Sequence, residues 1–225
     1  MDKLAAFGMA DCRPVKTPMV PGTRLEKALP LDAETTDKEH YMRAVGALMY
    51  LATSTRPDIA YTVGVLARFS SNPGSAHVAA LNHLFRYLQG TKELKLIYSG
   101  NVDEGEPFLT YTDADHGGEP DSGKSIGGFL VRMGGGAVSW RSKLQPVVTL
   151  STTEAEYVAA VEAGKEIKWM RNMLAEFGYP IRLRTEQQVT DSAESVVGSA
   201  DRRWSIDSTN CSTMSKTIDN NMTCS

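Results

Sequence analysis

Between Thr36 and Gly90, apolar side chains recur every three to four positions, the spacing that places them on one face of an α-helix. The pattern occurs three times, and turns that contain proline separate the repeats. Thr36 and Glu39 have capping-box spacing at the start of the first helix, and Gly90 stands where a C-terminal cap follows the third. A small helical subdomain over residues 37–92 is therefore predicted.

The period then changes to two, as in strands with one covered face. Alternation over residues 108–113, 125–133 and 137–143 predicts strands joined by glycine-containing turns, and hence an antiparallel sheet. A stripe of apolar residues over 155–174 predicts a long helix, which ends at Gly178-Tyr179-Pro180. The expected order is strand, strand, strand, helix.

The two ends of the chain show neither period. Residues 1–36 are rich in proline, threonine and charge, and their prolines are expected to prevent regular structure, so an extended arm is predicted. Residues 181–225 are dominated by small polar side chains, with one candidate strand at Gln188–Thr190. This composition favours a polar, divergent tail that is disordered or marginally ordered.

The overall composition is ordinary for a globular protein, with 41% apolar and 23% charged residues. The net charge of -3 argues against a generally basic nucleic-acid binder, although a local patch of Lys and Arg would suffice to hold phosphates. The 3 cysteines suggest neither a zinc site nor a disulfide framework. No stretch has the roughly 18 apolar residues of a membrane span, and no signal peptide is visible, so we expect neither membrane insertion nor secretion.

Acidic residues occur where predicted elements begin or end. Asp113 and Asp115 close the first strand, and residues two apart on a strand point to the same face. The segment Ser151–Tyr157 opens the long helix and contains two glutamates. Asp191 directly follows the candidate strand in the tail. Such groups of acids also occur on solvated turns, and that interpretation stays open.

Helix-capping rules separate the two glutamates. Ser151 and Glu154 have N-cap and N3 spacing, so Glu154 is expected to bond back to the Ser151 N–H. Glu156 lies beyond the cap, beside small and apolar residues, and is expected where the helix packs on the sheet. A carboxylate there needs a partner, and a divalent cation shared with Asp113 would provide one. Mg²⁺ suits oxygen ligands, and two such ions about 4 Å apart support phosphodiester hydrolysis.

Six segments of the chain form a specific combination: Phe7–Pro18, Tyr41–Leu51, Thr55–Ile59, Tyr111–Asp115, Lys124–Gly128 and Ser151–Tyr157. Together they resemble the ribonuclease H region of copia-type LTR retroelement polyproteins, over most of the chain. The resemblance implies that residues 1–36 and 37–92 end the reverse transcriptase and connect it to a ribonuclease H-like core over 93–180. The implied fold class is α/β, with an α+β-like mixed sheet that is incomplete at the C-terminus.

In that family the domain is a metal-dependent endonuclease that removes RNA from RNA–DNA hybrids, working with two Mg²⁺ ions. The resemblance implies that Asp113, Glu156 and Asp191 are the catalytic, metal-binding residues, with Asp191 matching only loosely. Asp115 belongs to the family motif and is expected to support the site. The implied partners are the hybrid and the upstream reverse transcriptase domain, in a cytoplasmic virus-like particle or the nucleus.

The chain also departs from the family pattern. His116 replaces the usual tryptophan and Glu119 the usual aspartate, and His116 is a candidate for proton transfer beside the acids. Ser205-Ile206-Asp207 lacks the histidine of the family's His-Ile-Asp segment, and the tail resembles sequence read out of frame. The polymerase motif Tyr-x-Asp-Asp does not occur, so no polymerase activity is expected. Two interpretations remain: a nuclease, or a catalytically inactive relic that folds partly or binds nucleic acid without cutting it.

Overall fold

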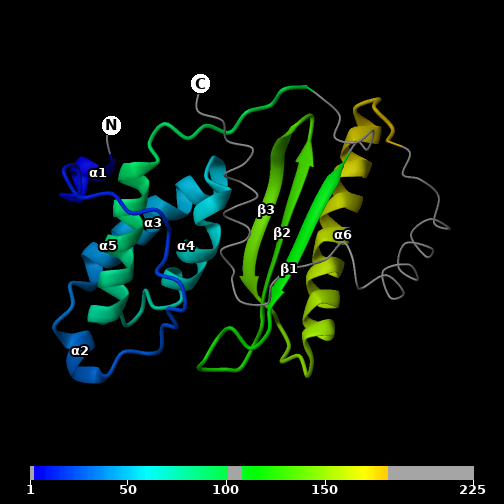
Figure 1. Cartoon of the computed structure of the whole chain (residues 1–225). Helices are drawn as coiled ribbons and strands as arrows, with labels where there is room; N and C mark the ends of the chain where they lie inside the picture. Colours follow the sequence, from blue (N-terminus) through cyan, green and yellow to red (C-terminus); the bar gives the residue numbers. More distant parts are fainter. Residues whose placement is uncertain (1–2, 101–107, 182–225) are drawn as a thin grey trace.

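A computed structural model describes residues 3–100 and 108–181 (Figure 1). The elements in chain order are α1 (Lys3–Ala6), α2 (Pro30–Glu34), α3 (Lys38–Ser54), the 3-10 turn η1 (Pro57–Ile59), α4 (Ala60–Ala67), α5 (Ser75–Gly90), β1 (Leu109–Asp115), β2 (Ile126–Met133), β3 (Gly136–Leu144) and α6 (Thr152–Glu176). The mixture of helix and strand agrees with the α/β class. No described helix combines the length and apolar composition needed to cross a membrane.

Helices α3, α4 and α5 pack around one apolar core, as their periodicity predicted. Leu48, Leu66 and Leu84 are at most 2% exposed within it. Burying a side chain of this size contributes about 1.5–3 kcal/mol. The Tyr41 hydroxyl enters the same core and donates to the Leu66 carbonyl at 2.9 Å, which joins α3 to α4.

The segment 1–36 is not the wholly extended arm that was expected. It contains α1 and α2, and Leu4 and Leu25 are buried in the helical core. Pro30 begins α2 because the first helical position needs no N–H donor. Pro14 packs so closely on the end of α5 that a Cβ at residue 90 would lie 3.0 Å from the Pro14 Cβ. Gly90 is the last residue of α5, and glycine leaves room there for Pro14. The prediction that Gly90 caps the helix from beyond its end was wrong.

The expected capping box at Thr36 and Glu39 was also wrong. Helix α3 begins one residue later, and the Asp37 carboxylate accepts from the His40 amide at 2.9 Å. Thr36 donates its hydroxyl to the Asp32 carbonyl instead. An aspartate adjacent to a threonine competes well for the N-cap position, because its charged side chain also interacts favourably with the helix dipole.

The three strands form an antiparallel sheet in the order β1-β2-β3, as predicted. Gly134 and Gly135 both have positive φ angles, of 60° and 81°, and form the two-residue turn between β2 and β3. Glycine suits this turn because both central positions of a type I′ hairpin need positive φ. The candidate strand at Gln188–Thr190 lies outside the described residues, so the mixed character expected of the sheet stays a prediction.

The sheet lies between α6 and the helices α3–α5 (Figure 1). Consecutive residues of β3 contact opposite sides, as expected of a strand. The Ser139 hydroxyl donates to Glu166 on α6 at 2.8 Å, whereas the Trp140 indole N–H donates to the Ala52 carbonyl of α3 at 2.6 Å. On the α6 side, Phe129 and Val131 pack with apolar residues of that helix.

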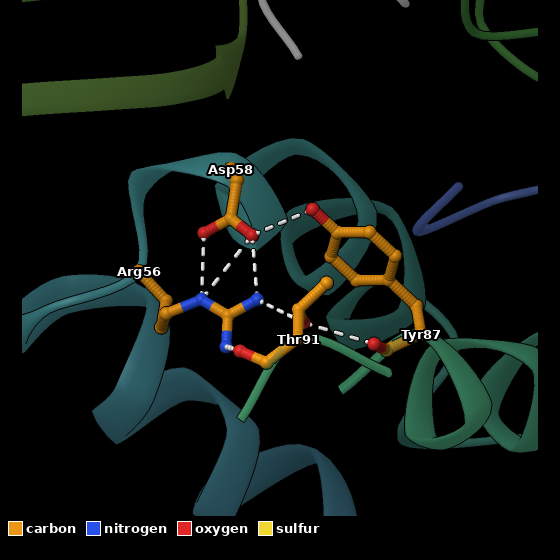
Figure 2. Close-up of polar contacts among 4 residues, drawn as sticks. All are labelled: Arg56, Asp58, Tyr87 and Thr91. Carbon is orange, nitrogen blue, oxygen red and sulfur yellow. Dashed lines mark hydrogen bonds and ion pairs between the residues drawn. The ribbon is translucent and has the colours of Figure 1, made fainter. Parts of the chain in front are cut away.

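A buried polar network stabilises the helical unit, which consists of α3, η1, α4 and α5 (Figure 2). The Arg56 guanidinium pairs with the Asp58 carboxylate at 2.7 Å, and the Tyr87 hydroxyl donates to the same carboxylate at 2.9 Å. Arg56 also donates to the hydroxyl and the carbonyl of Thr91. The network joins η1 to the end of α5, and it explains why the segment Thr55–Ile59 carries two opposite charges.

Candidate acidic site at the end of strand β1

Asp113 and Glu156, which are 43 positions apart in the sequence, approach one backbone amide. The Ala114 N–H donates to Asp113 Oδ1 at 2.9 Å and to Glu156 Oε1 at 3.3 Å. Asp113 lies near the end of β1, and Glu156 lies in the first turns of α6. The structure thus brings together the two acids that were selected from the sequence, while their role as metal ligands stays a prediction.

Small residues allow helix α6 to approach the sheet at this point. Ala155 and Ala159 are 0% and 3% exposed. A Cβ at Gly127 of β2 would lie 3.5 Å from the Ala159 Cβ, an ordinary van der Waals contact, so the helix backbone lies close to the strand here. This close packing carries Glu156 to the edge strand β1.

The surroundings of both acids disfavour their charged forms. Burial raises the pKa of Asp113, and the negative charge of Asp115 raises it further, against a lowering by the Ala114 hydrogen bond. Burial likewise raises the pKa of Glu156, with a further contribution from Asp113. Neither acid forms a salt bridge with a Lys or Arg of the described residues. The pair therefore has excess negative charge that a cation would relieve.

Asp115 is placed beside this pair by the turn that follows β1. The Gly118 N–H donates to the Asp115 carbonyl at 3.2 Å. The Asp115 carboxylate lies so close to Gly118 that a Cβ there would overlap it, so any other residue at position 118 would displace the Asp115 side chain. Asp115 contributes charge to the site, and its supporting role stays a prediction.

Glu154 acts at the end of the helix, with one difference from the expected pattern. The Ser151 hydroxyl accepts from the Glu154 amide at 3.1 Å, as N-cap and N3 residues do. The Glu154 carboxylate accepts from the amide of Leu150 at 2.7 Å, whereas the Ser151 amide was expected. The reciprocal bond thus reaches one residue further back, to the residue before the N-cap.

His116 and Glu119, the two departures from the family pattern, both form bonds with nearby loops. One ring nitrogen of His116 lies 3.1 Å from the Thr149 carbonyl and donates to it. Glu119 is 6% exposed and accepts from the amides of Asp121 and Ser122 and from the Ser122 hydroxyl. Burial acts to raise the pKa of Glu119, but these hydrogen bonds outweigh burial and lower it. Proton transfer by His116 stays a prediction.

The remaining candidate residues add no further ligand among the described residues. Asp191 lies outside the described residues. Within residues 3–100 and 108–181, no group of three or more His, Cys, Asp and Glu side chains is arranged to hold a metal ion. Three basic residues of the sheet and its loops have partners within the protein: Lys124 donates to the Pro146 carbonyl, Arg132 to the Gly135 carbonyl, and Arg141 pairs with Glu162 at 3.4 Å.

Sequence reasoning missed three buried polar residues beside the acids: Ser125, Gln145 and Thr149. Ser125 lies in the segment Lys124–Gly128 that carries the resemblance, but no pattern indicated its burial. Nothing in the sequence distinguishes Gln145 and Thr149 from the polar residues of ordinary turns. Their hydrogen bonds become visible only in the structure.

Comparison with known proteins identifies the class. The chain is 46% identical over 180 residues to a retrovirus-related Pol polyprotein from transposon TNT 1-94 of Nicotiana tabacum, covering 78% of this chain and 13% of that protein. It is 38% identical over 179 residues to the Pol polyprotein from transposon RE1 of Arabidopsis thaliana, covering 79% of this chain and 12% of that protein. A third relative, the secreted RxLR effector protein 161 of Plasmopara viticola, is 46% identical over 132 residues, which are 58% of this chain and 90% of that protein.

These matches define a retroelement protein. The chain belongs to the Pol polyprotein family of copia-type retrotransposons. It spans only 12–13% of the length of the polyprotein relatives named above. No protein-family model matches the chain, and no solved structure matches it.

Proposed function

We propose that this chain is the ribonuclease H part of its parent polyprotein and hydrolyses the RNA strand of RNA–DNA hybrids with Mg²⁺. One observation carries the proposal: Asp113 and Glu156, from different elements, accept from the same amide and have no basic partner among the described residues. Membership of the Pol family supports it, because a reverse-transcribed genome leaves RNA paired to new DNA. The upstream reverse transcriptase domain is the proposed partner within the polyprotein.

The donor set fits a hard divalent cation. Carboxylate oxygens are the ligands that Mg²⁺ prefers. Burial, and after it the charge of a neighbouring carboxylate, raises the pKa of each acid, and a bound cation would offset both effects. The chemistry that two such ions supply is an activated water and stabilisation of the leaving oxygen. Asp113 and Glu156 would hold the cation, and Asp191 is the proposed third carboxylate.

A backbone amide of the chain orients the two carboxylates. The Ala114 amide limits how the two carboxylates turn, so their oxygens are held before a cation arrives. Such preorganisation favours catalysis because little rearrangement is needed during the reaction.

The alternative function is an inactive relic that binds nucleic acid without cutting it.

The test is cleavage of an end-labelled RNA–DNA hybrid by the purified chain, with Mg²⁺ or with EDTA. Wild type is expected to cut the RNA strand only with Mg²⁺, and Asp113→Asn, Glu156→Gln and Asp191→Asn are each expected to lose at least about a hundredfold in rate. Glu154→Gln is the matched control, since it changes a glutamate in the same helical turn. Hybrid binding without cleavage by wild type would support the relic instead.

A further inference from the structure

Three uncharged polar side chains next to the acidic site are buried. Ser125 is 0% exposed, and Gln145 and Thr149 are each 4% exposed. Buried polar groups are retained only where hydrogen bonds compensate for the loss of water. Their partners therefore indicate what these residues hold in place.

One part of this set, Ser125 and Thr149, holds the end of β1. The Ser125 hydroxyl accepts from the Gly117 amide at 3.2 Å, and it lies 2.7 Å from the Thr149 hydroxyl. The Thr149 carbonyl is the partner of the His116 ring. The turn after Asp115 is thus tied to the loop that leads into α6.

The other part, Gln145, reaches the first turn of α6. The backbone N–H of Gln145 donates to the Ser125 carbonyl at 2.8 Å. The side-chain Nε2 of Gln145 donates to the Ala155 carbonyl, also at 2.8 Å. That carbonyl belongs to the peptide group that precedes Glu156. Gly127 leaves room for the side chain, because a Cβ at residue 127 would lie 3.1 Å from Gln145 Nε2.

We propose that Gln145 is a positioning residue, which holds the first turn of α6 so that the Glu156 carboxylate meets the Ala114 amide next to Asp113. The bonds form an unbroken path from the turn after β1, through Ser125 and Gln145, to the peptide before Glu156. The significance for catalysis rests on the nuclease function proposed above. The structural claim, that Gln145 sets the place of Glu156, does not.

Gln145→Met is the test variant, because methionine has a similar length and no N–H donor. Gln89→Met is a matched control: Gln89 Nε2 also donates to a backbone carbonyl, that of Ala10 at 2.6 Å, but this bond joins the helical unit to residues 1–36. In both glutamines the side-chain oxygen is buried without a partner among the described residues. The two variants therefore lose the same kind of bond.

The first measurement is the hydrogen-exchange rate and chemical shift of the Ala114 amide by NMR, without metal. Gln145→Met is expected to change both in the direction seen for Glu156→Gln, while Gln89→Met leaves them at wild-type values. The second is hybrid cleavage at a temperature where all variants are folded. Gln145→Met is expected to lower kcat by about tenfold to a hundredfold with little change in KM, because small misplacements of a catalytic group have effects of this size.

Equal behaviour of Gln145→Met and Gln89→Met in the NMR measurement would overturn the positioning role. An altered Ala114 amide in Gln145→Met combined with an unchanged kcat in an active enzyme would overturn the significance of Gln145 for catalysis. Failure of the nuclease proposal has a different signature: wild type cleaves nothing, while the Ala114 amide still responds to Gln145→Met and not to Gln89→Met.

Discussion

Asp113 Oδ1 and Glu156 Oε1 share a single hydrogen-bond donor, the Ala114 amide, at 2.9 Å and 3.3 Å. Two carboxylates around one N–H repel each other, and burial strengthens that repulsion. The arrangement is therefore unfavourable for stability by itself, and we expect the proposed cation to make it favourable.

Replacing Asp113 by asparagine is expected to stabilise the metal-free protein at neutral pH. The pKa values of Asp113 and Glu156 are raised above their ordinary values of 3.8 and 4.5, so the folded state binds protons more readily than the unfolded chain. Ionisation then lowers stability as pH rises above the ordinary values, and the loss is complete above the raised pKa values. Asp113→Asn should raise Tm by on the order of 2 °C at pH 7.5 and leave it unchanged at pH 3.

Thermal denaturation in EDTA and in Mg²⁺ checks this prediction. With Mg²⁺ at pH 7.5, wild type should gain stability through binding, whereas Asp113→Asn should gain little. A Tm for Asp113→Asn below that of wild type in EDTA would contradict the assigned repulsion.

Substitutions of Glu154 and of Glu156 should have opposite effects: the first should lower stability, and the second should abolish activity. Glu154→Ala removes the acceptor for the Leu150 amide and a negative charge at the helix start, so it should destabilise the fold by about 0.5–1 kcal/mol while cleavage persists. Glu156→Ala should abolish cleavage without comparable destabilisation. Urea denaturation combined with the hybrid assay measures both effects. Loss of cleavage in Glu154→Ala under folded conditions would reverse the two roles.

Breaking the buried network of Figure 2 should strongly lower the free energy of unfolding. Asp58→Asn leaves the Arg56 guanidinium, whose side chain is 10% exposed, without its counter-charge, and about 3 kcal/mol of stability should be lost. Arg141→Gln is the matched control, because the Arg141–Glu162 pair is 46% and 38% exposed and should contribute under about 1 kcal/mol. Chemical denaturation of both variants gives the comparison, and equal losses would contradict it.

Trp140→Phe should loosen the sheet from the helical unit. The Trp140 indole N–H donates to the Ala52 carbonyl, one of the last carbonyls of α3, which have no partner within the helix. Phenylalanine keeps most of the apolar contact but leaves that carbonyl unsatisfied, so about 1–2 kcal/mol should be lost. Urea denaturation followed by circular dichroism measures the loss, and a change below about 0.3 kcal/mol would show that the contact is unimportant.

Periodicity predicted the main elements because helix and strand each impose their own spacing on apolar residues. The three helices, the antiparallel strands and the long helix α6 all occur where the pattern placed them. The distinction between Glu154 and Glu156 was equally accessible, because capping is a local property that follows from residue spacing. The close approach of Asp113 and Glu156 followed from the expectation that α6 packs on the sheet.

Features that depend on contacts between distant segments could not be read from the chain. Gly90 resembled a cap, but contact with Pro14 accounts for it, and that contact joins residues 76 positions apart. The arm was expected to be extended because prolines break helices, yet its apolar residues gain enough from burial to pack on the core. Gln145 gave no signal at all, since its role depends on a bond to α6.

Paramagnetic broadening by Mn²⁺, which takes oxygen ligands as Mg²⁺ does, tests the central claim most directly. In spectra of the ¹⁵N-labelled chain, a substoichiometric amount of Mn²⁺ should selectively broaden the amides around Asp113 and those around Glu156 together. Either Asp113→Asn or Glu156→Gln should greatly weaken the broadening at both places, while Glu154→Gln should leave it intact. Broadening of only one of the two segments, or broadening that survives both substitutions, would contradict a shared cation site.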